Sequence, residues 1–297
     1  MKIFVTGITG HSGRFYTQRL AAEGSRDKLI CLVRKTSNTD ILDSSGLDYE
    51  KAVGDLNDVD FMAEHMTGCD MVLHIAGIYQ SINVINAALR AGIKNAIVVH
   101  TTGMFSRFKS ASADYIKVEE EVLSHRDSIN ITVLRPTMIY GTSGDRNMYK
   151  LVGYLDRHSF FPVFGSGKNL MQPVHAKDLG DAYYGVIHNW DVCANREYNL
   201  AGRDPIEYIE IIRTVEEYLK TNTKNIKFPI WLSLIGAYAY NFLFKSAIIS
   251  VEQVKRMMED KAFPYEAARN DFGYSPMSFR EGIKGEVEEY LREKNEA

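Results

Sequence analysis

The sequence predicts an α/β protein built on a doubly wound parallel sheet. Two observations carry this prediction. Apolar runs of strand length alternate with helical patterns through the first 135 residues, which is the rhythm of strand–helix–strand units. The first of these runs leads directly into a glycine-rich turn that opens a helix.

The first strand and its turn predict a dinucleotide site. Residues 2–5 suit a buried strand, and glycines follow at positions 7, 10 and 13. Gly7 permits a tight turn, Gly10 lets the backbone approach phosphates, and Gly13 lets the next helix pack closely on the sheet. The free N–H groups of that helix then face a pyrophosphate. The residues expected to contact the cofactor here are Gly7, Thr9, Gly10, His11, Ser12 and Gly13.

The remaining elements follow from hydrophobic patterning. Buried parallel strands are expected over residues 29–33, 71–75, 96–100 and 131–134, with helices over 83–91 and 115–124. After about residue 140 the rhythm becomes irregular. Helices are expected over 147–158 and 178–188, with Asp178 as the N-cap of the second, and a strand over 197–200. From residue 206 onward helices dominate the pattern.

Composition excludes several classes of protein. The 35 basic and 38 acidic residues give a net charge of −3, which does not favour a nucleic-acid partner. Cys31, Cys69 and Cys193 lie far apart and fit no metal or redox spacing, so we expect buried thiols in a reducing, cytoplasmic setting. The first strand begins almost at Met1, which leaves no room for a signal peptide. His74 has no acidic or cysteine partner nearby, so no metal site is expected.

The glycine turn, with Thr6 before its first glycine, resembles the extended branch of the short-chain dehydrogenase/reductase superfamily, which contains nucleotide-sugar epimerases, dehydratases and reductases. The resemblance covers nearly the whole chain. Its other matching blocks are Gly-Asp-Leu at 54–56, Val-Leu-His-Ile-Ala-Gly at 72–77, Leu-Arg-Pro at 134–136, Tyr-Gly at 140–141, and the runs 172–179 and 271–276.

The resemblance implies a Rossmann-type sheet with a small, mostly helical C-terminal substrate lobe. Residues 1–140 would form the NAD(P)-binding Rossmann domain. Residues 141–297 would combine segments that return to the sheet with the substrate-binding lobe. Asp55 and Leu56 match the family's adenine contacts, and Ala76 and Gly77 match the small-residue turn that passes beneath the cofactor.

The end of the second strand decides which nicotinamide cofactor is expected. An acidic residue there bonds the ribose hydroxyls of NAD, whereas an arginine binds the 2′-phosphate of NADP. Here the strand is followed by Arg34 and Lys35, and no carboxylate occurs before Asp40. The sequence therefore predicts NADP rather than NAD.

The catalytic block departs from the family pattern. The family uses a Tyr and a Lys four residues later on one helix face, with an upstream Ser or Thr that orients the substrate. Here the residue four after Tyr115 is Glu119. Counting back without gaps from Arg135 puts Lys117 at the family's lysine position and Ala113 at its tyrosine position. Tyr115 and Lys117 lie about 200° apart around a helix, so they cannot both face one cofactor.

Three interpretations remain open. In the first, Lys117 binds the nicotinamide ribose, and Tyr140 or a water handles protons. In the second, Tyr115 is catalytic and Lys117 is displaced. In the third, the protein binds its cofactor without ordinary turnover. Thr101 and Thr102, at the end of the fourth predicted strand, occupy the place of the orienting hydroxyl, and Thr102 is the candidate catalytic residue of the two. From the count, we expect Lys117 rather than Tyr115 to face the cofactor.

The substrate side resembles nucleotide-sugar enzymes in two segments, 144–149 and 172–175. Arg146 and Lys168 are candidates for a diphosphate, and Asn147 and Gln172 for sugar or carbonyl oxygens.

The apolar stretch 229–251 has its aromatic and aliphatic residues near helical spacing, with lysines at its ends. Asn241 and Lys245 interrupt it, which argues against a transmembrane span. An internal helix is the simpler interpretation; a peripheral membrane contact or a homodimer contact is the alternative.

The function expected from the resemblance is an NADP-dependent oxidoreductase or epimerase acting on a nucleotide-linked sugar, or a reductase of another carbonyl compound. The alternative is a cofactor-binding regulatory or scaffold protein with a degenerate active site.

Overall fold

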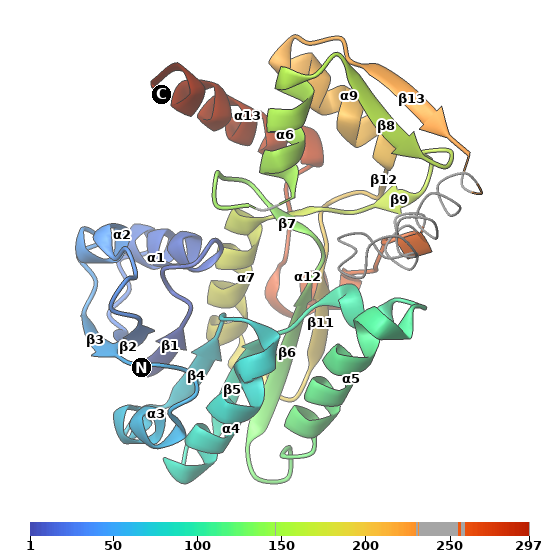
Figure 1. Cartoon of the computed structure of the whole chain (residues 1–297). Coiled ribbons are helices and arrows are strands. Elements are labelled where there is room, and N and C mark those ends of the chain that lie inside the picture. Colours follow the sequence, from blue (N-terminus) through green and yellow to red (C-terminus); the bar gives the residue numbers. More distant parts are fainter. Residues whose placement is uncertain (146, 230, 232–254, 257–258, 297) are drawn as a thin grey trace.

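A parallel sheet forms the centre of the computed structural model, which describes residues 1–145, 147–229, 231, 255–256 and 259–296. Within these residues the sheet has seven strands in the order β11-β6-β5-β4-β1-β2-β3 (Figure 1). The predicted doubly wound α/β fold is therefore confirmed. The strands are β1 (Lys2–Thr6), β2 (Lys28–Val33), β3 (Tyr49–Val53), β4 (Met71–His74), β5 (Asn95–Val99), β6 (Asn130–Pro136) and β11 (Glu197–Leu200).

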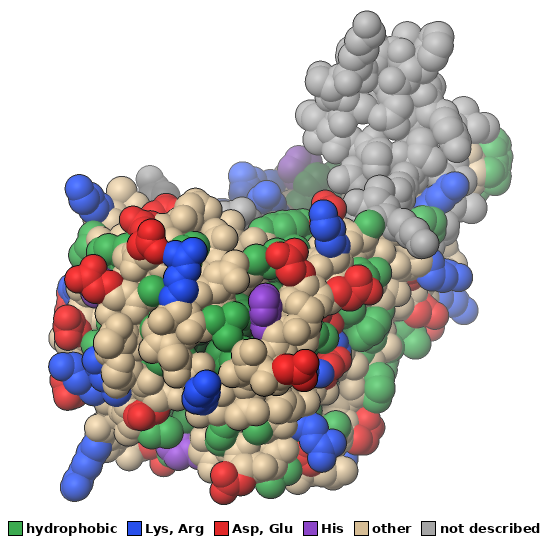
Figure 2. All heavy atoms as spheres, turned by 90° about the horizontal axis from the view of Figure 1, so that it is seen from below, with side chains coloured by type: hydrophobic (Ala, Val, Ile, Leu, Met, Phe, Trp, Pro, Cys, Tyr) green, Lys and Arg blue, Asp and Glu red, His purple; other side chains and the backbone are tan. Residues whose placement is uncertain are grey.

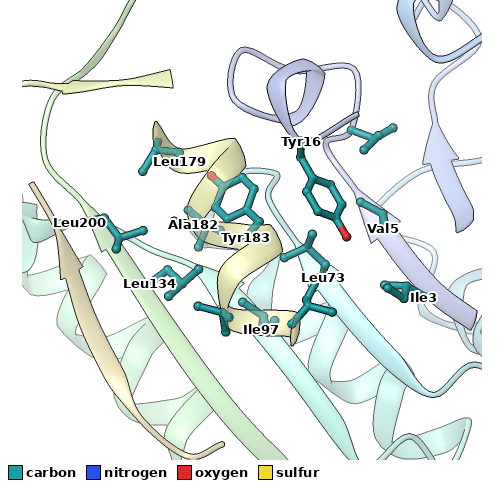
Figure 3. Packing of buried hydrophobic residues seen from close by; sticks show 14 of the residues in the cluster. Ile3, Val5, Tyr16, Leu73, Ile97, Leu134, Leu179, Ala182, Tyr183 and Leu200 are labelled. Carbon is teal, nitrogen blue, oxygen red and sulfur yellow. The ribbon is translucent and has the colours of Figure 1, made fainter. Parts of the chain in front are cut away.

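Helices cover both faces of the sheet, which is why its central strands are continuous apolar runs. One face carries α1 (Gly13–Ala22) and α7 (Ala176–His188). The other carries α3 (Val59–Met66), α4 (Ser81–Arg90) and α5 (Lys109–Leu123). On the first face, the rings of Tyr16 and Tyr183 pack edge to face at 6.1 Å above the strands (Figure 3).

One strand of the sheet was absent from the sequence prediction. β3 is the edge strand beside β2, and only Ala52 of its five residues is buried. An edge strand with one covered face and charged neighbours has no continuous apolar run, so the pattern does not reveal it.

The C-terminal half returns to the sheet and also builds a separate small layer. α7, the short α8 (Trp190–Cys193), β11 and α12 (Glu266–Phe272) pack on or beside the sheet. The small lobe has its own core and lies above the carboxyl ends of the strands (Figure 1). It contains α6 (Met148–Arg157), β8 (Phe160–Phe164), α9 (Tyr208–Leu219), β13 (Lys224–Phe228) and α13 (Phe279–Glu296).

The lobe is less helical than expected. β13 pairs in parallel with β8, although the sequence predicts mostly helix from residue 206. Its residues are half-buried or exposed, so its strand structure depends on pairing with β8 rather than on an apolar pattern. Two short pairs connect the lobe to the sheet: β7 (Ile139–Tyr140) with β10 (Val174–His175), and β9 (Leu170–Met171) with β12 (Ile206–Glu207). The described part of the chain also contains three short helical segments: α2 (Asp40–Asp43), η1 (Ile78–Gln80) and η2 (Thr102–Phe105).

The start of α7 corrects the predicted N-cap. The cap is His175, whose Nδ1 accepts a hydrogen bond from the Lys177 backbone N–H at 3.0 Å. Asp178 lies inside the first turn, where its buried carboxylate accepts a bond from the Met277 N–H at 3.1 Å. The helix begins earlier than its apolar pattern because histidine supplies the capping acceptor in place of the expected carboxylate.

The distribution of surface charge and the burial of the cysteines agree with the predictions made from composition. Acidic and basic side chains are interspersed over the face seen from below in Figure 2, without a field of one sign. Cys31, Cys69 and Cys193 are free and buried, as predicted. The apolar stretch 229–251 lies almost wholly outside the described residues, so its proposed membrane or oligomer contact stays a prediction. No described helix combines the length and the apolarity needed to cross a bilayer.

Candidate functional site

A groove of about 550 Å³ opens where β1 lies between β2 and β4. This is the point at which the strand order reverses, and ligands of doubly wound sheets bind there, beyond the carboxyl ends of the strands. The structure brings together most of the predicted cofactor residues on its wall, namely Gly7, Thr9, Gly10, His11, Ser12, Arg34, Asp55, Leu56, Ala76 and Gly77.

The glycine turn forms a cradle that side chains would fill. Gly7 has φ +77°, and a Cβ there would lie 2.6 Å from the backbone nitrogen of Ala76. Gly13 is buried at the start of α1 rather than in the groove wall, and a Cβ there would lie 2.2 Å from the Gly7 carbonyl oxygen. The two glycines therefore let the loop fold tightly onto the helix N-terminus, and the open cradle fits a pyrophosphate.

The end of β2 contributes a cation and a hydroxyl to the groove. Arg34 and Ser37 both line it, and the backbone N–H of Arg34 donates a hydrogen bond to Ser37 Oγ at 3.1 Å. Lys35 is exposed and is not part of the wall, so the structure separates the two predicted cations. Among the described residues that form the wall, the only carboxylate is Asp55, whose Oδ1 accepts from the Asn57 N–H at 2.8 Å.

Several wall residues were not named as cofactor contacts from the sequence. Asn57 and Gln80 follow predicted contacts by one to three positions, and Ser37 lies in the turn after Arg34. Ile139 comes from β7, far along the chain, and an isolated apolar residue gives no signal of its own. His74, by contrast, is fully buried as expected, with its Nδ1 2.6 Å from Thr6 Oγ1.

His11 is the titratable group of the glycine turn. Burial lowers the pKa of its imidazole, against the opposing attraction of Asp145. Its Nε2 is buried and has no hydrogen-bond partner among the described residues. A neutral imidazole with an unused nitrogen adds a polar contact for a ligand without adding a charge.

Helix α5 corrects the predicted catalytic arrangement. Lys117 is exposed and contributes nothing to the groove wall, so it does not face the groove as the gap-free count predicts. Tyr115 is half-buried, and its ring lies beside that of Tyr79, tilted by 34° with the ring centroids 5.7 Å apart. Its ring also lies against Gly103, where an added Cβ would be 3.2 Å from Tyr115 Cε2. The described part of α5 therefore presents no tyrosine–lysine pair on one face.

Glu119, the residue at the fourth position after Tyr115, has a structural partner instead. Its carboxylate is buried and accepts from Arg135 Nε at 3.0 and 3.1 Å, and it lies 2.8 Å from His100 Nδ1. Burial opposes its ionisation, but the hydrogen bonds from His100 and Arg135 hold the pKa of Glu119 below its ordinary value. This pairing ties α5 to β5 and β6 and fixes the register of the helix.

A second cavity, of about 590 Å³, adjoins the groove. Met138 lines this cavity and the next residue, Ile139, lines the groove, so the two open on either side of one short segment. Thr101 and Thr102 also line the cavity. The Thr102 hydroxyl is buried and donates to the Pro136 carbonyl at 3.2 Å. Tyr140 is fully buried against Phe279 and His175 and is not part of either wall, which removes it as the proton-handling alternative.

The predicted substrate residues do not gather in this cavity. Gln172 uses its amide on the backbone, donating to Gly202 O and accepting from Phe263 N–H, both at 2.8 Å. Asn147 is exposed at the N-cap of α6, and Lys168 is exposed in a turn. Arg146 lies outside the described residues. The sequence could show that Gln172 lies in a loop. It could not show that its amide is bonded to backbone groups 30 and 91 residues away.

Comparisons with known proteins agree with this geometry. A family model described as NAD(P)H-binding matches residues 7–160, more than half of the chain. The chain therefore belongs to the NAD(P)H-binding family. Solved structures of a dTDP-glucose 4,6-dehydratase and of UDP-sugar 4-epimerases share its fold. UDP-glucuronic acid 4-epimerase from Bacillus cereus, in complex with UDP-glucuronic acid and NAD, aligns with a TM-score of 0.76 at 16% identity, covering 98% of this chain and 99% of that one.

Two curated relatives of this NAD(P)H-binding protein match it at low identity, and only the name of the second states an activity. Short-chain dehydrogenase/reductase family 42E member 1 of Danio rerio is 25% identical over 190 residues, 58% of this chain and 48% of the relative. This chain thus aligns with about half the length of that relative. N-acetyl-α-D-glucosaminyl-diphospho-ditrans,octacis-undecaprenol 4-epimerase of Escherichia coli O157:H7 is 22% identical over 271 residues, 78% of this chain and 80% of the relative.

Proposed function

We propose that this protein is an NADP-dependent oxidoreductase or epimerase of the extended short-chain type. Its substrate would be a nucleotide-linked sugar or a similar carbonyl or alcohol compound. The observation that carries the proposal is the pair of adjoining spaces: a groove with an open glycine cradle and Arg34, and a cavity reached across Met138 and Ile139. One space suits a dinucleotide and the other a second reactant.

The residues present suit the cofactor. The backbone around Gly7 and Gly10 and the N-terminus of α1 would hold the pyrophosphate, and Arg34 with Ser37 the 2′-phosphate. Asp55 and Leu56 would flank the adenine, and Ala76 and Gly77 would leave room beneath the nicotinamide half. When bound, a nicotinamide cofactor supplies or accepts a hydride. The nucleotide-sugar class is supported by the fold shared with the Bacillus cereus epimerase, whose complex contains UDP-glucuronic acid. The substrate named for the Escherichia coli relative is a sugar diphosphate linked to undecaprenol, so it supports a diphosphate-linked sugar rather than a nucleotide in particular.

A second candidate function is cofactor binding without turnover, as in a regulatory or scaffold protein. The outward position of Lys117 and the tilted packing of the Tyr115 ring against Tyr79 favour it, because α5 then lacks the usual proton-transfer pair. Hydride transfer to or from the bound nicotinamide separates the two candidates.

We expect Arg34→Ala to weaken NADPH binding while leaving NADH binding within about threefold. The guanidinium would lose a charge-assisted hydrogen bond to the 2′-phosphate, worth about 1.5–3 kcal/mol, or roughly a 10- to 150-fold loss in affinity. Titration of both cofactors by calorimetry measures this. Lys35→Ala is the matched comparison, because Lys35 is the neighbouring cation outside the groove wall. Equal affinities of the unmodified protein for NADPH and NADH would count against the NADP assignment.

A further inference from the structure

The wall of the cavity beside the cofactor groove contains Lys261, a residue that belongs neither to the glycine turn nor to α5. This wall combines the segment after β5, the segment after β6, and a C-terminal stretch that includes Arg256, Lys261 and Phe263. Lys261 reaches this wall from a part of the chain about 145 residues beyond the helix that normally supplies the family's proton-transfer residues.

The backbone fixes the position of Lys261. Its N–H donates to the Leu170 carbonyl at 2.7 Å, and the residue forms a parallel bridge with Met171, which also lines the cavity. A strand-like attachment of this kind holds a side chain more precisely than a free loop does.

The carboxylates nearest to Lys261 in sequence are bonded to other groups. Glu259 is buried and accepts from Ser106 Oγ at 2.8 Å and from the Arg107 N–H at 2.7 Å. Asp260 accepts from the Leu170 N–H at 2.7 Å. Within the described part of the chain, the ammonium of Lys261 makes no ion pair. A half-buried ammonium in a cavity wall without a carboxylate partner can donate to a ligand oxygen instead.

The surroundings of Lys261 also favour release of its proton. Burial lowers the pKa of its ammonium, and the positive charge of Arg256 lowers it further, against the opposing charge of Glu259. The other charged groups of the cavity wall are Arg107 and Asp260. A lysine in such a setting is a stronger acid than an exposed lysine.

We propose that Lys261 is the acid that protonates the substrate oxygen when a carbonyl group is reduced in this cavity. The role rests on the proposed function, in which the bound cofactor supplies the hydride. As the carbonyl carbon gains that hydride, the π electron pair of the C–O bond moves to oxygen. The Nζ–H bond of Lys261 breaks while the new O–H bond forms, and the amine then takes a proton from water. In the oxidative direction the neutral amine accepts the alcohol proton.

The test uses the 297-residue protein, NADPH and two carbonyl probes. One probe is dTDP-4-keto-6-deoxyglucose, a nucleotide-linked ketone, and the other is 9,10-phenanthrenequinone, a carbonyl compound without a nucleotide. Lys261→Gln is expected to lower kcat by about 100-fold, the lower end for loss of a general acid. Lys261→Arg keeps the charge but cannot release a proton, so it should show a similar loss. Lys94→Gln removes an exposed lysine elsewhere and should leave kcat unchanged.

The pH dependence adds a signature that a purely structural lysine would not give. The protonated form is the active one in reduction, so kcat should fall as pH rises through the pKa of Lys261, and this fall should be missing in Lys261→Gln. NMR of the reductively ¹³C-methylated protein gives a readout without turnover. The resonance absent from Lys261→Gln should titrate at lower pH than is usual for a lysine, and it should move when the nucleotide-linked ketone is added.

The outcomes are distinct. NADPH affinity should be equal in all variants, since Lys261 lies outside the groove wall. If Lys261→Gln keeps kcat within threefold, or if Lys261→Arg restores it, the acid role is overturned while the proposed function stands. If the unmodified protein binds NADPH yet reduces neither probe, the proposed function fails and the role of Lys261 fails with it.

Discussion

Replacing Glu119 with alanine is expected to lower the free energy of unfolding by about 3 kcal/mol. The change leaves the buried guanidinium of Arg135 without its bidentate partner, and breaking one half of a buried ion pair costs about 3–5 kcal/mol. The lower end applies because Glu197 still accepts a hydrogen bond from Arg135. Urea unfolding at neutral pH, followed by circular dichroism, measures the change.

The matched control is Glu120→Ala, which removes the adjacent, exposed carboxylate of the same helix. It should change stability by less than about 0.5 kcal/mol. Because the folded state holds the pKa of Glu119 below its ordinary value, its contribution is present above the unfolded pKa and is lost as pH falls through the folded one. Equal stability losses in the two variants would show that the Glu119–Arg135 pair does not hold the helix in place.

Glu286→Gln is expected to make stability less sensitive to rising pH. Glu286 on α13 is fully buried, and burial, reinforced by Asp145, raises the pKa of its carboxyl from 4.5 to about 8. The folded state therefore holds a proton that the unfolded chain releases. That contribution to stability is lost as pH rises from about 4.5 to 8. Each pH unit corresponds to about 1.4 kcal/mol, so the contribution changes by roughly 4 kcal/mol between pH 5 and pH 9.

The measurement compares the free energy of unfolding of both proteins at pH 5 and at pH 9. Glutamine keeps an acceptor for the Gly141 N–H, which donates to Glu286 Oε2 at 2.7 Å. Any cost of the amide itself is the same at both pH values and cancels in the difference. The exposed Glu288, two residues along α13, provides the control as Glu288→Gln, which should follow the unmodified protein. If the stability of Glu286→Gln changes with pH as much as that of the unmodified protein, Glu286 is ionised in the folded protein.

The sequence by itself determined six of the seven strands of the sheet, the glycine turn and the position of the cofactor groove. These depend on local information: apolar runs identify strands buried on both faces, and Gly7 and Gly13 occupy positions where a Cβ would collide with backbone. The position of Arg34 in the groove wall could be predicted in the same way, because the end of the second strand lies at the groove in any such sheet.

Only the tertiary structure decided which side chains face the cavity. A gap-free count from Arg135 placed Lys117 at the cofactor, but the pairing of Glu119 with Arg135 sets the rotation of α5 and turns Lys117 outward. β3 and β13 form because neighbouring strands supply hydrogen bonds, not because their own residues are apolar. Lys261 reaches the cavity through a single bridge to Met171. Contacts between distant segments leave no periodic trace in a sequence, and these contacts determine the wall of the cavity.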